Sequence, residues 1–387
     1  MSLFTVPKEA FGLDISDFSI KAALLEEKKD GFKVRSFCYL PIPGEILVGG
    51  EIKDEGKVVE ALRKVVSSCQ ISSIKNKNVV VSVPEAKSFV RVIELPKMEK
   101  RELKEAVQWE TEQHIPVNIE NVYFDWQILE EDRAYLKSAS PKEKARKGFL
   151  ETKEGKISVL VAACRKTLID SYYNALVKAG FNPLVFEAES QATVRVLINE
   201  TIKDKAVLIA DMGGKRTSFI IFDKGAIRFT SSVAFSGELL TKEIAVKLGT
   251  DIEEAEAIKI ACGLDKTKRG GKVFEIIEPV LASLTADIEH AINFYHSHYP
   301  QCNKINTILL CGGGSGLAGL ADYLALRLKT KVMWGNPWLN IIPDYQERKA
   351  RSRKMPIPPK HVFRFVTALG LAMRGANLKK YHLYQYD

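Results

Sequence analysis

Residues 211–222 read DMGGKRTSFIIF, and they directly follow the apolar run AVLIA at 206–210. An acid and two glycines therefore stand at the turn between two apolar runs, each long enough for a buried strand. Asp and Gly are favoured turn residues, so turn chemistry alone accounts for them. The alternative interpretation is that a charged group approaches the backbone here, because glycine leaves no Cβ in its way.

The same layout occurs near the N-terminus, where residues 11–26 read FGLDISDFSIKAALLE. Both segments contain an apolar strand, an Asp, a small polar turn, a Ser or Thr and a second apolar strand. An internal repeat of this kind predicts two similarly folded α/β domains. If a rough two-fold axis relates the domains, Asp14 and Asp211 face each other across a cleft.

Each turn would offer backbone N–H groups, a carboxylate and a hydroxyl to a ligand. Converging N–H groups form a nest for phosphate oxygens, Lys21 would offset phosphate charge, and two carboxylates suit a Mg²⁺ ion that keeps most of its waters. We therefore predict that Asp14 and Asp211 hold Mg²⁺. The residues expected at the phosphates are Asp14, Ser16, Ser19 and Lys21 in the first turn, and Asp211, Gly213, Gly214, Lys215 and Thr217 in the second.

A third glycine cluster, CGGGSGLAG at 311–319, lies between a predicted strand and a predicted helix. It contains G-x-G-x-x-G, but a Rossmann site needs an acid about 20 residues later, and the sequence has no Asp or Glu between Asp322 and Asp344. The P-loop pattern G-x-x-x-x-G-K-[ST] is absent too. We expect the cluster to contact the base or a phosphate of a mononucleotide through Gly312, Gly313, Gly314 and Ser315.

The predicted helix at 252–261 places Glu256 and Lys259 three residues apart and so on one face. Both side chains could reach a ribose. The alternative is an ordinary ion pair exposed to solvent.

The composition is that of a globular protein of more than one domain, with 387 residues, 46% hydrophobic and 27% charged. No apolar run approaches the ~18–20 residues that span a bilayer, and the N-terminus, which carries Glu9, does not read as a secretory signal. We expect a cytoplasmic protein without direct membrane insertion. None of the six cysteines forms a Cys-x-x-Cys pair, which predicts free thiols.

The net charge of +9 includes two basic segments, KEKARK at 142–147 and ERKARSRK at 347–354. Both are interpreted as solvated loops. No aromatic residues are interleaved with them, so we predict no nucleic-acid partner.

The motifs together resemble the actin-like ATPase superfamily, and the resemblance covers nearly the whole chain. GLDISDFSIK and DMGGKRTSF resemble its two phosphate loops, LLCGGGSGLAGL its adenosine motif, and AEAIKIACG at 255–263 its ribose-contacting helix. FEAESQA at 186–192 and TALGLA at 367–372 resemble its two connecting helices. The resemblance implies two RNase H-like domains around a nucleotide cleft that takes ATP and Mg²⁺. Ser16 departs from the glycine that is usual in the first phosphate loop.

Residues 90–129 are similar to the extra subdomain of the PilM family of type IV pilus assembly, with WETEQHIP and VYFDWQIL as the most specific stretches. That family implies a peripheral position at the inner membrane, a groove for the N-terminal cytoplasmic peptide of a PilN-type membrane protein, and a link to the pilus assembly machinery or a related secretion or fimbrial system. The FtsA family of cell-division proteins shares the plan, but it normally ends in a linker and an amphipathic membrane helix. No such helix follows Gly370.

On this resemblance the expected fold is α/β, with an extra α/β subdomain inserted in the first domain. The first domain would comprise 1–78, 161–190 and 360–387, and the insertion 79–160, which contains a charged connection at 130–156. The core of the second domain would comprise 191–236 and 273–359, and a small ribose-side subdomain 237–272.

The leading functional hypothesis is an ATP-binding scaffold with at most weak ATPase activity. Glu187 is the candidate to orient an attacking water, with Glu189 and Gln191 as competitors, and an acid here is equally typical of a helix N-cap. A sugar-kinase-type phosphotransferase would need a catalytic Asp, and none stands out in 79–129. A metal enzyme built on His290, His296 and His298 is disfavoured, because positions 296 and 298 point to different sides of a helix. Whether copies of the chain assemble is left open.

Overall fold

The computed structural model describes residues 9–98, 100–115, 117–129, 155–299, 302–342 and 355–378. Both basic segments, and most of the expected connection at 130–156, lie outside these ranges.

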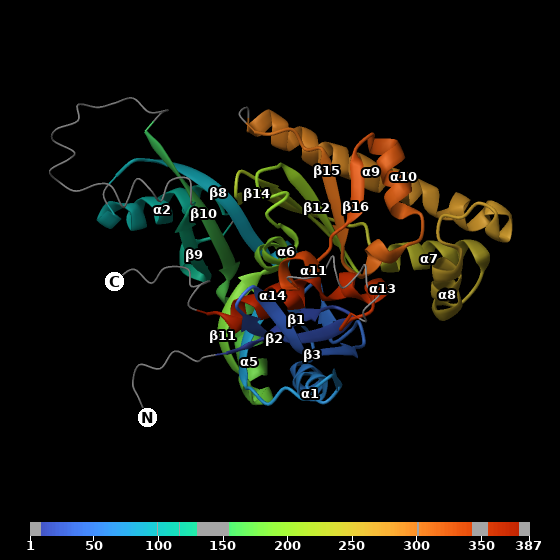
Figure 1. Ribbon diagram of the computed structural model, residues 1–387, viewed down its shortest axis with the longest axis horizontal. Helices are drawn as coiled ribbons and strands as arrows, with labels where there is room; N and C mark the ends of the chain where they lie inside the picture. The colour runs from blue at the N-terminus through green and yellow to red at the C-terminus, as the bar shows by residue number, and fades with distance from the viewer. Residues whose placement is uncertain are drawn as a thin grey trace.

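The first domain is built on a six-stranded sheet with the order β11-β7-β1-β2-β3-β6 (Figure 1). β1, β2 and β3 are antiparallel, whereas β7 and β11 run parallel to β1. The strands are β1 Phe11–Ser16, β2 Ser19–Lys28, β3 Gly31–Pro41, β6 Cys69–Gln70, β7 Asn78–Val83 and β11 Asn182–Ala188.

The second domain repeats this arrangement in a five-stranded sheet with the order β14-β13-β12-β15-β16. Three antiparallel strands again lie beside two parallel ones, so β12 and β13 correspond to β1 and β2. The strands are β12 Val207–Met212, β13 Thr217–Asp223, β14 Ala226–Val233, β15 Thr307–Cys311 and β16 Lys331–Trp334. The two sheets confirm that the sequence repeat reflects two similarly folded domains.

Amphipathic helices cover the outer face of each sheet. In α1, Val58, Leu62 and Val65 recur at helical spacing and are fully buried against the first sheet. Asp54 caps its start by accepting the Lys57 N–H, and Gly180, in the left-handed conformation at φ 91°, ends α5. The outer helices are α1 Glu55–Val65 and α5 Lys166–Ala179 in the first domain, and α9 Lys272–His298 and α10 Leu320–Leu328 in the second. Two further helices, α7 Gly237–Leu248 and α8 Ile252–Cys262, pack on each other and on α9 beside the second sheet (Figure 1).

Two helices lie between the sheets, α6 (Glu189–Leu197) and α14 (Val366–Ala376), as Figure 1 shows at the centre of the molecule. They approach each other and β1 at backbone distance. A Cβ on Gly370 would lie 1.9 Å from the Ala192 carbonyl oxygen, and one on Gly12 would lie 2.4 Å from that of Ala368. Glycine is therefore required where these elements meet.

The inserted subdomain has a three-stranded sheet with the order β8-β10-β9, covered by α2. Leu103 and Val107 of α2 are fully buried against it. The elements are β8 Ser88–Pro96, α2 Lys100–His114, β9 Val122–Ile128 and β10 Lys156–Arg165. The expected start at 79 is wrong, since β7 pairs with β1 and β11 in the first domain.

Shorter elements complete the described chain. They are β4 Leu47–Val48, β5 Glu51–Ile52, α11 Trp338–Ile341, α13 Pro359–Val362, and the short 3₁₀ turns η1 Glu85–Lys87, η2 Ile119–Asn121, η3 Lys268–Gly271, η4 Gly313–Gly316 and η5 Phe363–Phe365.

The expectation of six free thiols is wrong for one pair. Cys38 of β3 and Cys69 of β6 stand directly opposite in an antiparallel ladder and form a disulfide. Cross-strand neighbours are close enough for a disulfide, but their separation of 31 residues in the chain does not reveal the pairing. The free cysteines among the described residues are Cys164, Cys262, Cys302 and Cys311.

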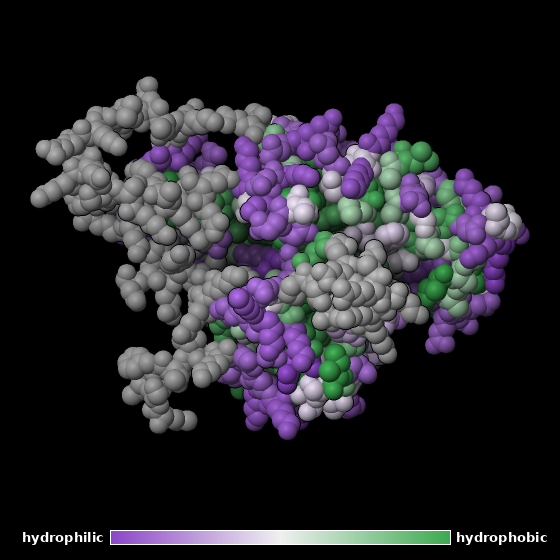
Figure 2. All heavy atoms as spheres, viewed as in Figure 1, coloured by the Kyte–Doolittle hydropathy of each residue, from purple (hydrophilic) through white to green (hydrophobic). Residues whose placement is uncertain are grey.

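Hydrophilic side chains predominate on the face seen in Figure 2, with hydrophobic residues in separate patches. Among the helices of the described residues, none combines the length and apolar character needed to cross a membrane.

We predict that Gly370→Ala destabilises the protein by about 3 kcal/mol, because the new methyl group displaces the α6 backbone. Gly56→Ala in α1 is the matched control, because a Cβ there meets only an Asp54 oxygen at 3.5 Å. The control should be neutral or stabilising by about 0.5–1 kcal/mol. Denaturant unfolding measures both, and equal effects would contradict the packing argument.

Candidate functional site

The first hairpin, β1–β2, presents a buried acid and a buried base in register. Asp14 lies opposite Lys21 in the ladder, and the Lys21 Nζ donates to Asp14 Oδ2 at 2.8 Å. The Ser82 hydroxyl donates to the other carboxylate oxygen at 3.3 Å. At the turn, the Ser16 hydroxyl donates to the Ser19 carbonyl at 2.9 Å. The local pairing of β1 with β2 therefore gathers four predicted residues.

The second hairpin, β12–β13, places Asp211 near the end of β12. Its turn is closed by the Gly213 N–H, which donates to the Arg216 carbonyl at 2.9 Å. The Thr217 hydroxyl is fully buried and donates to the Phe235 carbonyl at 2.9 Å. Thr217 thus holds the turn against the segment before α7, and its hydroxyl hydrogen is not directed at the cleft.

The two hairpins lie side by side, because Phe18 of the first contacts Gly214 of the second. Burial, and then the negative charge of Asp14, raise the pKa of Asp211 to about 6, and Lys21 acts in the opposite direction. That Asp14 and Asp211 hold one ligand between them stays a prediction.

The tips of the hairpins touch through Phe18. A Cβ on Gly214 would lie 2.4 Å from the Phe18 ring, and one on Gly44 would lie 2.5 Å from it. The Lys215 Nζ donates to the Gly44 carbonyl at 3.1 Å and lies 5.1 Å from the centre of the Phe18 ring. Lys215 therefore fastens the second hairpin to the first in this structure.

The third glycine cluster lies against the second hairpin. A Cβ on Gly312 would lie 2.4 Å from Asp211 Oδ1, and one on Gly314 would lie 3.2 Å from the Met212 carbonyl oxygen. Only glycine at 312 lets the backbone come this close. The Ser315 hydroxyl is buried and donates to the Gly312 carbonyl at 2.8 Å. α10 starts only at Leu320, so the cluster itself is a 3₁₀ turn and not a helix N-terminus.

Glu256 and Lys259 do not form the exposed ion pair of the alternative interpretation. Lys259 is 9% exposed, and its Nζ donates to Glu256 Oε2 at 2.7 Å and to the Gly237 carbonyl at 2.9 Å. Against the effect of burial, hydrogen bonds from Lys259 and Thr241 lower the pKa of Glu256. The pair lies beside the glycine cluster, because a Cβ on Gly237 would be within 4 Å of both Lys259 Nζ and Gly314 Cα.

The structure does not place Glu187 in the cleft. This side chain is buried in ion pairs with Arg195 and with Arg374, which, against the effect of burial, lower its pKa. Glu189, two residues later, faces the cleft instead. Burial, and then the charges of Asp14 and Asp211, raise its pKa well above the usual value. Glu187 lies in β11 and Glu189 begins α6, and the sequence could not say where the strand ends and therefore which acid points toward Asp14 and Asp211.

Nothing in the described part of the chain supports a metal site built on His290, His296 and His298. The His296 Nδ1 lies 3.1 Å from the Cys302 sulfur, and the His298 Nδ1 lies 2.9 Å from the Phe294 carbonyl oxygen. Within the described ranges no group of three metal-binding side chains occurs.

A groove, which we call the subdomain groove, lies between the inserted subdomain and the first domain. Its volume is about 460 Å³. Tyr123 and Tyr173 on its border are 48% and 49% exposed, and the Tyr123 hydroxyl donates to Asp170 Oδ1 at 3.1 Å. Its lining residues are Val83, Ser88, Tyr123, Phe124, Asp125, Ala162, Ala163, Cys164, Ile169, Asp170, Tyr173, Phe186, Glu187, Ala188 and Gln191.

Sequence reasoning missed Phe18, Glu85 and the groove residues. The position of Glu85 could have been predicted, because it follows β7, and β7 runs parallel to β1. The carboxyl ends of parallel strands meet at one sheet edge, so Glu85 belongs on the same edge as Asp14. Phe18 and the groove depend on contacts between distant segments, for which the sequence carries no local signal.

Comparison with known proteins identifies the family of this chain. The family described as type IV pilus assembly protein PilM matches residues 12–376. Among solved structures, a chain of a PilM–PilN type IV pilus biogenesis complex is similar, with a TM-score of 0.75 and 25% identity over 96% of this chain and 100% of that one. The ethanolamine utilization protein EutJ from Carboxydothermus hydrogenoformans is similar in fold alone, with a TM-score of 0.54 and 15% identity over 95% of this chain and 90% of that one.

Curated relatives include cell division proteins FtsA. The protein of Neisseria meningitidis serogroup B is 25% identical over 232 residues, which is 55% of this chain and 53% of the relative. That of Pseudomonas aeruginosa is 36% identical over 90 residues, or 23% and 22%. The chain thus spans about half of the first relative and less of the second. With the duplicated sheets, the matches confirm the predicted actin-like fold.

We predict that the free energy of unfolding falls by about 2–3 kcal/mol between about pH 4 and pH 6.5 because of Asp211. Its pKa is raised to about 6 in the folded protein, so the folded state binds the proton more tightly, and this stabilisation is lost as Asp211 ionises. Asp211→Asn should lack this decline, whereas Asp204→Asn, at an exposed turn, should keep it. Denaturant unfolding across this pH range tests it, and a slope unchanged in Asp211→Asn would contradict the buried acid pair.

Proposed function

Since this chain belongs to the PilM family of type IV pilus assembly proteins, we propose that it is an ATP-binding scaffold for the N-terminal cytoplasmic peptide of a PilN-type membrane protein. The observation that supports the nucleotide part is the contact between the two hairpins that carry Asp14 and Asp211, through Phe18 and Gly214. The observation that carries the partner part is the subdomain groove, together with the similarity to a chain of a PilM–PilN complex.

The acid site fits a magnesium ion. Lys21 pairs with Asp14, and the pKa of Asp211 is raised first by burial and then by the negative charge of Asp14. Mg²⁺ binds through one or two carboxylates and retains waters. Asp14 and Asp211 would hold it through those waters, and the ion would neutralise charge on the phosphates.

The other predicted residues would contact different parts of the nucleotide. Backbone N–H groups of both turns and the Lys21 ammonium would bind phosphates. The Gly312–Gly314 backbone would lie against the base, and Glu256 with Lys259 would reach the ribose. Thr217, Ser315 and Lys215 would act by holding the loops, because their hydrogen bonds run to backbone carbonyls.

Hydrolysis would be weak in this arrangement. Glu189 replaces Glu187 as the candidate to orient water, because it alone of the two faces the acid pair. Burial and neighbouring charges favour its protonated form. A protonated carboxyl is a poor base, which supports a role in which ATP binding matters more than turnover.

ATP would act by bridging the two domains. Its binding favours whichever domain arrangement contacts both hairpins, a population shift that requires differential affinity. The subdomain groove borders β11 and α6, which carry Glu187 and Gln191 into it. The groove would therefore respond to the position of α6, and the bound membrane protein would hold the scaffold at the inner membrane beside the assembly machinery.

We predict that Asp211→Ala lowers the affinity for Mg²⁺–ATP by at least about tenfold, because the ion loses one of its two acidic partners. Asp204→Ala serves as the control at an exposed position. Equilibrium dialysis with labelled ATP measures both. Unchanged affinity in Asp211→Ala would contradict the assignment, and ATP consumption that requires an added sugar or small alcohol would favour a phosphotransferase.

We predict that Tyr173→Asp abolishes capture of a PilN-type N-terminal peptide, because it places a charge on the apolar border of the groove. Leu326→Asp on α10, which is 78% exposed and outside the groove, should leave capture unchanged. A pull-down with and without ATP measures the effect, and capture should increase with ATP. Equal capture by both variants would place the peptide elsewhere.

A further inference from the structure

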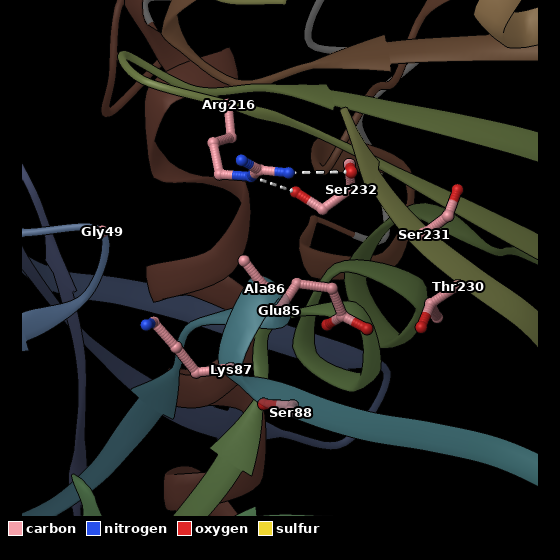
Figure 3. A pocket seen from close by; sticks show the side chains of 9 residues that line it. All are labelled: Gly49, Glu85, Ala86, Lys87, Ser88, Arg216, Thr230, Ser231 and Ser232. Atoms are coloured by element: carbon pink, nitrogen blue, oxygen red, sulfur yellow. Dashed lines mark hydrogen bonds between the residues drawn. The ribbon is translucent and has the colours of Figure 1, made fainter. Parts of the chain in front are cut away.

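A polar pocket of about 480 Å³ lies where the first domain and the inserted subdomain meet the second domain, and we call it the inter-domain pocket. Figure 3 shows its side chains converging from η1 and β8 on one side and from the second domain on the other. It is separate from the subdomain groove except for Ser88. It is lined by Gly49, Glu85, Ala86, Lys87, Ser88, Arg216, Thr230, Ser231 and Ser232.

Glu85 supplies a buried oxygen that lacks a well-aligned hydrogen bond. The residue is 5% exposed, and its Oε2 accepts the Ser190 N–H at 3.0 Å. Its Oε1 is buried and forms no well-aligned hydrogen bond within the described chain. Burial raises the pKa of this carboxyl, and the Ser190 and Thr230 hydroxyls beside it act in the opposite direction. In Figure 3 the carboxyl group points toward Thr230 across the pocket. A buried oxygen in this situation is costly, so a ligand that donates a hydrogen bond to it would be favoured.

The other lining groups are hydrogen-bond donors and cations. Arg216 is held at the pocket by Ser232, whose hydroxyl accepts from Nε at 2.8 Å and whose carbonyl accepts from Nη2 at 2.9 Å. Lys87 lies on the opposite side and donates to Glu51 at 2.6 Å. Thr230, Ser231 and Ser232 of β14 form the opposite wall, and the Thr230 hydroxyl lies on the side of Glu85. Two cations and several hydroxyls are typical of a site for an oxyanion.

We propose that the inter-domain pocket binds inorganic phosphate in a form that still carries a proton. At neutral pH both H₂PO₄⁻ and HPO₄²⁻ have a P–OH group, which can donate to Glu85 Oε1. The other oxygens accept from Arg216, Lys87 and the β14 hydroxyls. Sulfate has the same shape but no proton at this pH, and it would meet the Glu85 oxygen with a lone pair.

The site is distinct from the proposed nucleotide site. Its cations are Lys87 and Arg216, whereas the hairpin cleft uses Lys21. Because its walls come from both domains, bound phosphate would stabilise the domain arrangement in which Lys87 and Arg216 border the same pocket. Phosphate binding in this pocket does not require ATP binding at the hairpins, so each can be tested without the other.

Isothermal titration calorimetry of the full chain with phosphate, and with sulfate at equal ionic strength and pH 7, tests the proposal. We expect one saturable phosphate site and sulfate binding at least about tenfold weaker. Arg216→Gln and Lys87→Gln should each weaken phosphate binding by about tenfold or more. Arg327→Gln, an exposed arginine of α10 paired with Glu278, is the matched control and should not.

Two further variants test the role of Glu85 and the location. Glu85→Gln should remove the preference for phosphate over sulfate, because an amide can donate as well as accept. If loss of the Ser190 contact prevents folding, Thr230→Val should still weaken phosphate binding several-fold. Absence of saturable binding, equal affinity for sulfate, or binding lost in Lys21→Ala but kept in Arg216→Gln would overturn the proposal.

Discussion

The proximity of two carboxylates from different domains is the constraint around which this part of the molecule is organised. Burial, and then the negative charge of Asp14, raise the pKa of Asp211. Lys21 offsets part of the charge, and Ser82 hydrogen-bonds the Asp14 carboxylate. An acid pair kept together against its own repulsion is suited to a cation, and this is the physical basis for assigning Mg²⁺ to the cleft.

Small residues hold the acids at this separation. Gly370 meets the α6 backbone, Gly12 meets the α14 backbone, and Gly312 meets the Asp211 carboxylate, each at a distance that a Cβ would prevent. The two sheets share one core through these helices, with Ala23 of β2 and Ile209 of β12 in the same cluster. The separation of the hairpins is therefore set by backbone contacts rather than by flexible side chains.

Much of the architecture follows from local pattern. The two hairpins, the glycine turn at 311–319 and the helix α8 are predicted by apolar periodicity and turn chemistry, because these signals lie within a few residues of each other. The choice between Glu187 and Glu189 depends on where β11 ends against its neighbouring strand, and the pairing of Cys38 with Cys69 depends on which strands become neighbours. Those are properties of the assembled sheet, and the same holds for Phe18 between the hairpin tips.

Glu85 and Glu189 exchange hydrogen bonds in a way that ties separate regions together. The Glu85 N–H donates to Glu189 Oε2 at 3.1 Å, and the Ser190 N–H donates to Glu85 Oε2. The η1 turn and the first turn of α6 thus form a single clasp. The acid cleft, the subdomain groove and the inter-domain pocket all border this clasp. A small rotation of this clasp would change the shape of the groove and of the pocket, and it would also change the surroundings of the two acids. A ligand bound at one of these places would therefore alter the affinity of the other two.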